Sequence, residues 1–132
     1  MNNITEHLMK NITKNRILSD AEFQKCITDI NLKFPPDYLE FMRMTNGGEG
    51  FLSDGFYIML WRFEDLIEFN KMYNVKEFAP NLFLIGSDGS DTAFGLQKSN
   101  SNFVEVPFIG LSDNEAVAKG ENFVDLLNSL VK

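Results

Sequence analysis

The stretch LFLIGSDGSDTAFGLQ, residues 82–97, joins two apolar runs through a segment of serine, aspartate and glycine. An Asp-Gly pair between two apolar runs is a strong signal for a β-hairpin, because both residues can adopt the positive φ angles that tight turns need. The stretch therefore predicts two antiparallel strands. Asp88 and Asp91 are expected to lie exposed near the tip, where a partner could reach them.

Loops that bind metals, phosphates or dinucleotides were the alternatives for this segment, and each requires a residue that differs here. A calcium loop of the EF-hand type starting at Asp88 would need glycine at its sixth position and glutamate at its twelfth, where Ala93 and Ser99 stand. A P-loop starting at Gly86 would continue with Gly-Lys-Ser/Thr, but the sequence reads DTA. A dinucleotide fingerprint would need glycine in place of Asp88. We therefore expect neither a metal nor a cofactor at this loop.

Three further runs beside the hairpin are short, rich in aromatic and β-branched residues, and separated by turn residues, which is typical of strands. They are EGFL (49–52), FYIMLW (56–61) and NFVEVPF (102–108). Such consecutive short strands indicate a mainly antiparallel sheet.

Helical signals occur before, between and after these runs. Ser19 and Glu22 form a capping-box pattern at the start of one helix. Pro36 suits the first turn of the next helix, and Asn46 with the two glycines after it provides a left-handed end. Apolar spacing predicts the remaining helices, over residues 4–12, 63–73 and 121–131.

This order of elements is typical of the α+β class, and we expect a sheet of about five to six strands with flanking helices. The 132 residues fit a single domain, residues 1–132. Cys26 is the only cysteine, so no internal disulfide is expected, and a reducing cytoplasm is the expected location. No window approaches the ~20 apolar residues of a membrane span.

Charge is distributed unevenly along the chain. Residues 1–43 contain six basic and six acidic residues, whereas residues 44–132 contain six and thirteen and so carry the whole net charge of −7. Such a field repels nucleic acid and anionic membranes, and it attracts a basic partner. We expect no direct nucleic-acid or membrane binding. The alternative is that the acidity only keeps the protein soluble.

Residues for catalysis are scarce, and we expect no enzyme. His7 is the only histidine, and no nucleophile lies near it in the sequence, so a surface or capping role is expected. His7 and Cys26 cannot furnish a typical zinc site. A site made only of carboxylates, for Mg²⁺ or glycoside hydrolysis, stays open because some of the later acids must lie close in space.

Trp61, the single tryptophan, ends the run 56–61. Its side chain could pack in the core, with the indole N–H bound to a backbone carbonyl, or it could anchor an interface. The flanking apolar residues favour packing.

Five segments follow one another in a recognisable order: FPPDYLEFMRMTNGGEGFL (34–52), YIMLWRFEDLIEFNKMY (57–73), the stretch 82–97, VPFIGLSDN (106–114) and GENFVDLLNSL (120–130). In this order they resemble the SUKH superfamily, also called the Smi/Knr-like domain, most clearly over residues 34–132, with residues 1–33 as N-terminal helices. The chain departs from the family pattern at Ser90 and Gln97.

The resemblance implies an α+β fold and no shared catalytic site. Its bacterial branch looks like a set of cytoplasmic immunity proteins of polymorphic toxin systems, commonly directed against nuclease toxins. The resemblance therefore implies a toxin domain as partner and leaves the oligomeric state open, and the net charge of −7 predicts that this domain is basic. A regulatory protein-binding scaffold of the Smi/Knr type, without a toxin partner, is the alternative. Our candidate partner-binding residues are Asp88, Asp91, Glu49, Asp54 and Trp61.

Overall fold

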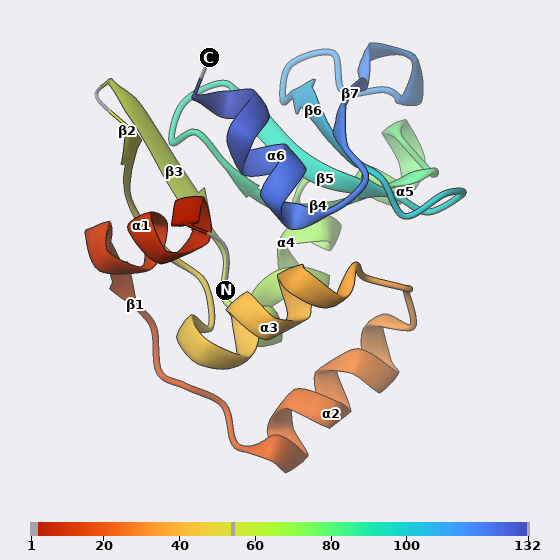
Figure 1. Cartoon of the computed structure of the whole chain (residues 1–132). Helices are drawn as coiled ribbons and strands as arrows, with labels where there is room; N and C mark the ends of the chain where they lie inside the picture. Colours follow the sequence, from red (N-terminus) through yellow and green to blue (C-terminus); the bar gives the residue numbers. More distant parts are fainter. Residues whose placement is uncertain (1–2, 54, 132) are drawn as a thin grey trace.

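Seven antiparallel strands form one sheet in the computed structural model, which describes residues 3–53 and 55–131. Each strand pairs with its neighbours in sequence order (Figure 1). The strands are β1 (Ile12–Lys14), β2 (Gly48–Ser53), β3 (Phe56–Leu60), β4 (Leu82–Ser87), β5 (Thr92–Gln97), β6 (Phe103–Pro107) and β7 (Val117–Gly120). The α+β class and the antiparallel sheet are confirmed.

The five predicted strands are β2 to β6, and β1 and β7 lie at the two edges of the sheet. The sheet therefore has seven strands, one more than the five to six expected. Ile12 was expected on the first helix, but it begins β1 and pairs with Gly50. The helix ends at Asn11, whose side-chain amide donates to the carbonyl oxygen of His7 at 2.8 Å. Pairing with β2 thus overrides the helical spacing of Ile4, Leu8 and Ile12.

Six α-helices and two short 3₁₀ turns lie in the described part of the chain. The helices are α1 (Asn3–Asn11), α2 (Asp20–Ile30), α3 (Pro36–Thr45), α4 (Leu66–Met72), α5 (Val75–Phe78) and α6 (Phe123–Leu130), and the turns are η1 (Phe63–Asp65) and η2 (Asp113–Glu115). The helix predicted over 63–73 is thus divided into η1 and α4. The helix predicted from residue 121 begins at Phe123, because the side chain of Asn122 accepts a hydrogen bond from the N–H of Asp125 at 2.8 Å.

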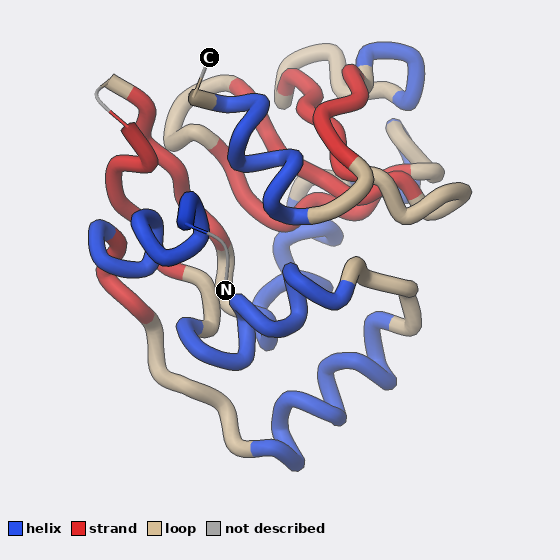
Figure 2. The backbone as a smooth tube through the Cα atoms, in the orientation of Figure 1, coloured by secondary structure: helices blue, strands red, loops and turns tan. Residues whose placement is uncertain are grey.

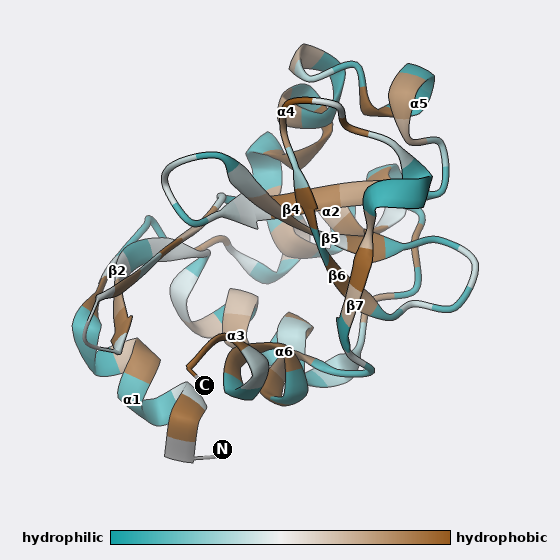
Figure 3. Ribbon diagram, turned by 90° about the horizontal axis from the view of Figure 1, so that it is seen from above, coloured by the Kyte–Doolittle hydropathy of each residue, from teal (hydrophilic) through white to brown (hydrophobic). Residues whose placement is uncertain are grey.

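Helices cover the two faces of the sheet unequally. Helices α1, α3 and α6 lie on one face and α4 and α5 on the other, with the hydrophobic central strands between them (Figure 3). The larger core, which contains Tyr38, Phe94 and Phe123, lies beneath α1, α3 and α6. A smaller core under α5 contains Val75, Leu84 and further apolar residues. All six residues of β4 are buried, so this strand is covered on both faces.

Strands β2 and β3 project from the side of the sheet that lies away from α5 (Figure 2). Helix α1 contacts β2 on the face of the larger core. Helices α4 and α5 instead pack against β4. Within residues 3–53 and 55–131, no helix is therefore packed on the second face of β2 and β3.

Candidate protein-interaction surface

Four side chains lie on this uncovered face of β2 and β3. Glu49 and Phe51 of β2 pair directly with Met59 and Tyr57 of β3. Leu52, Ile58 and Leu60, which alternate with them, are buried in the larger core, so these four side chains project from the opposite face. Phe51 is 56% exposed. We call Glu49, Phe51, Tyr57 and Met59 the open face.

The stretch 82–97 forms the predicted hairpin, in which residues 88–91 join β4 to β5. Gly89 adopts a φ of +82°, consistent with the Asp-Gly signal. Asp88 is partly buried rather than exposed, because its carboxylate accepts hydrogen bonds from the N–H groups of Ser90 and Thr92 at 2.9 and 3.3 Å. Asp91 is exposed as expected. Of the two aspartates, Asp91 is thus the more accessible to a partner.

The loop 88–91 lies against the open face. Ser87, just before the loop, pairs with Met59. A Cβ atom placed on Gly89 would lie 3.4 Å from the sulfur of Met59 and 3.5 Å from the ring of Tyr57. The loop and the open face therefore form one continuous surface.

A row of aromatic rings extends this surface over α4. Trp61 stacks on Phe69 with ring centroids 4.7 Å apart and on Tyr73 at 6.0 Å. Tyr73 in turn lies 4.8 Å from Phe108, whose backbone N–H donates to the carbonyl oxygen of Asp91 at 3.0 Å. We call Trp61, Phe69, Tyr73 and Phe108 the aromatic row. The aromatic row therefore ends at Phe108, beside the hairpin loop.

A shallow hollow of about 220 Å³ lies between the open face and the aromatic row. Its lining includes Glu49, Trp61, Phe69 and Asp65, and also the cation Arg62. Trp61 is half-buried, so it packs against its neighbours and keeps part of its surface in the hollow. Carboxylates beside aromatic rings are suited to the arginine and lysine side chains of a partner, through ion pairs and cation–π contacts.

Tyr57 fixes the carboxylate of Glu49. Its hydroxyl donates to Oε2 of Glu49 at 2.8 Å, and this hydrogen bond raises the pKa of Tyr57. A carboxylate held in this way loses less side-chain entropy when a partner binds.

The structure brings four of the five predicted residues to this surface. Glu49 and Trp61 line the hollow, Asp88 and Asp91 belong to the adjoining loop, and Asp54 lies outside the described residues.

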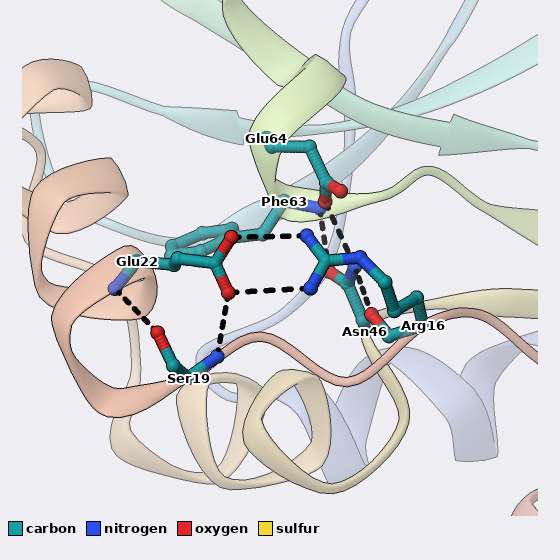
Figure 4. Close-up of polar contacts among 6 residues, drawn as sticks. All are labelled: Arg16, Ser19, Glu22, Asn46, Phe63 and Glu64. Carbon is teal, nitrogen blue, oxygen red and sulfur yellow. Dashed lines mark hydrogen bonds and ion pairs between the residues drawn. The ribbon is translucent and has the colours of Figure 1, made fainter.

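Asn46 holds together the segments beneath this surface through its side-chain hydrogen bonds. The sequence predicted only that Asn46 ends a helix. It ends α3 with a φ of +52°, as predicted. Its side-chain oxygen accepts from the N–H of Phe63 at 2.9 Å, and its amide nitrogen donates to the carbonyl oxygen of Arg16 and to Glu64 at 2.9 and 2.8 Å (Figure 4). Asn46 therefore ties η1, two residues after Trp61, to α3 and to the segment before α2.

Gly47 has no room for a side chain. Its φ is +79°, and a Cβ atom there would lie 2.4 Å from the carbonyl oxygen of Leu60 and 2.8 Å from that of Trp61. The pair Asn46-Gly47 thus sets the position of the chain at Trp61.

The model of the SMI1/KNR4 family (SUKH-1) matches residues 17–129. The chain belongs to this family. The SUKH-1 match includes both Asn46-Gly47-Gly48 and the hairpin. It begins at residue 17, whereas the resemblance seen in the sequence is clearest from residue 34 onward. No curated protein shows a significant match to the chain.

Carboxylates and aromatic rings lie together on the surface of this SUKH-1 chain. Within residues 3–53 and 55–131, no group of three or more His, Cys, Asp or Glu side chains is placed to hold a metal ion. Partial burial raises the pKa of the Cys26 thiol, which lowers its reactivity. None of the helices in the described part is long and apolar enough to cross a membrane. Carboxylates and aromatic rings on an uncovered sheet face are features of protein interfaces.

Proposed function

We propose that the chain is a cytoplasmic immunity protein that binds a cognate nuclease toxin domain of a polymorphic toxin system and blocks its active or substrate site. The observation that carries the proposal is Glu49, held by Tyr57 beside Trp61 in a hollow on an uncovered sheet face. Membership of a family that includes immunity proteins supports it.

Electrostatics explain how such a surface could neutralise a nuclease. A nuclease attracts the phosphate backbone with lysine and arginine side chains. A surface that presents Glu49, Asp65 and Asp91 competes for the same cations, and the net charge of −7 accelerates the encounter. Inhibition by occlusion needs no catalytic group on the immunity protein.

Co-expression with the toxin domain encoded by the neighbouring gene tests the proposal. The wild-type chain should restore growth and co-purify with the toxin. The double variant Glu49→Lys/Asp91→Lys should lose both, while Glu6→Lys/Glu40→Lys, on exposed positions of α1 and α3, makes the same change in charge and should retain both. Failure of the wild-type chain to rescue growth and to co-purify would favour a regulatory scaffold of the Smi/Knr type.

A further inference from the structure

A second hollow lies on the other side of α4. This groove has a volume of about 570 Å³ and lies among α4, α5 and the start of β4. Its apolar lining includes Ile67, Leu82 and Phe83. The volume is in the range of ligand sites, roughly 300–1,000 Å³.

Three lysines line this groove. Lys71 comes from α4, Lys76 from α5, and Lys98 from the turn after β5. They are three of the six basic residues in the acidic part of the chain, residues 44–132. Among the residues that the structure describes, Glu77 is the one carboxylate in the lining. None of the three lysines forms an ion pair with an acidic residue in the part of the chain that the structure describes. We call this site the lysine groove.

The backbone that carries the lysines is held firmly. The side chain of Asn70 donates to the carbonyl oxygen of Leu84 at 2.9 Å and accepts from its N–H at 2.8 Å, which ties α4 to β4. The N–H of Lys98 donates to the carbonyl oxygen of Asn81 at 2.7 Å. The groove is therefore formed before any ligand binds, which lowers the entropy cost of binding.

We propose that the lysine groove binds an acidic peptide segment of a partner protein, with one apolar side chain of that segment on Ile67, Leu82 and Phe83. Lysines on three different elements distribute positive charge along the groove, which matches carboxylates spaced along an extended peptide. Ile67, Leu82 and Phe83, which lie beside the lysines, favour a peptide with apolar side chains over a nucleic acid. This site is separate from the surface proposed to meet the toxin.

Two peptides would test the charge requirement directly. Fluorescein-labelled DELDFED should bind the purified full chain saturably by fluorescence anisotropy, and more weakly as salt is added. The matched peptide NQLNFQN, which lacks the charges, should bind at least about tenfold more weakly. Amide NMR shifts induced by DELDFED should concentrate at residues 67–77, 82–83 and 98. Equal binding of both peptides, no saturable binding of DELDFED, or shifts concentrated elsewhere would each overturn the proposal.

Charge-matched variants localise the effect. The groove variant is Lys71→Glu/Lys76→Glu/Lys98→Glu, and its control is Lys10→Glu/Lys14→Glu/Lys33→Glu, at exposed positions of the N-terminal region. The groove variant should weaken DELDFED binding about tenfold or more, with the control within about twofold of the wild type. Equal losses in both would show non-specific attraction and overturn the proposal. If the groove variant fails to fold, the milder variant Lys71→Gln/Lys98→Gln takes its place. An unchanged affinity of this variant for DELDFED would also overturn the proposal.

Discussion

The two sides of α4 carry surfaces of opposite character. On one side, Phe69 and Tyr73 belong to the aromatic row, which adjoins the carboxylates of the open face and the hairpin loop. On the other, Ile67 and Lys71 line the lysine groove. Residues four apart lie on the same face of a helix, as Phe69 and Tyr73 do. Ile67 and Lys71 precede them by two residues, about half a turn, and so lie on the opposite face. A chain with a net charge of −7 thus presents three lysines at one local site.

Strand β4 connects the same two regions lengthwise. Its first residues, Leu82 and Phe83, line the lysine groove, and its last residue, Ser87, leads into the hairpin loop. Six strand residues span roughly 17 Å. The hairpin loop and the lysine groove thus lie at opposite ends of β4.

Gly47, which packs against the backbone at Trp61, can be changed without altering any residue of the lysine groove. We expect Gly47→Ala to lower the free energy of unfolding by about 3 kcal/mol or more, because it adds a positive-φ penalty to a clash with two backbone carbonyls. Urea unfolding measures the loss. Gly110→Ala is the matched control, since Gly110 has a similar φ of +76° and open space around it. An equal loss in both variants would contradict the clash.

Removing the tryptophan side chain should affect binding at only one of the two surfaces. We expect Trp61→Ala to weaken toxin binding by about 2 kcal/mol, or about 30-fold, because a half-buried aromatic anchor is lost. Binding of DELDFED should stay unchanged, since Trp61 does not line the lysine groove. Isothermal titration calorimetry measures both affinities. If the peptide affinity fell as far as the toxin affinity, the two surfaces would not be independent.

The start of α2 offers a smaller effect, because Arg16, Ser19 and Glu22 line neither hollow. Hydrogen bonds from Arg16 and then from Ser19 lower the pKa of Glu22 to about 2, from an ordinary value near 4.5. A lowered pKa contributes stability above about pH 4.5, and that contribution disappears as the pH falls towards 2. The difference in Tm between wild type and Glu22→Gln should therefore shrink from pH 5 to pH 2 in thermal scans. A difference that stayed constant over this range would show that the ion pair does not stabilise the fold.

Local signals in the sequence predicted much of the framework. The capping box of Ser19 and Glu22 and the left-handed end at Asn46 depend on residues within a few positions, and both are present in the structure. The hairpin at Asp88-Gly89 is local in the same sense. Strands β1 and β7, of three and four residues, were missed because pairing with distant residues defines them.

The surfaces were harder to predict for the same reason. Glu49 and Trp61 were chosen from charge and composition, and the fold brings them to one hollow. Lys71, Lys76 and Lys98 are spread over 28 positions of an acidic region, so only the packing of α4 and α5 on β4 reveals the groove that they share.

The affinity of the toxin domain for two charge-reversed variants shows which of the two surfaces binds the toxin. Glu49→Lys/Asp91→Lys alters the open face and its loop, and Lys71→Glu/Lys98→Glu alters the lysine groove. Calorimetry should show toxin binding at least about tenfold weaker for the first variant and within about twofold of wild type for the second. A toxin affinity that survives the first variant and falls with the second would contradict the assignment of the two surfaces.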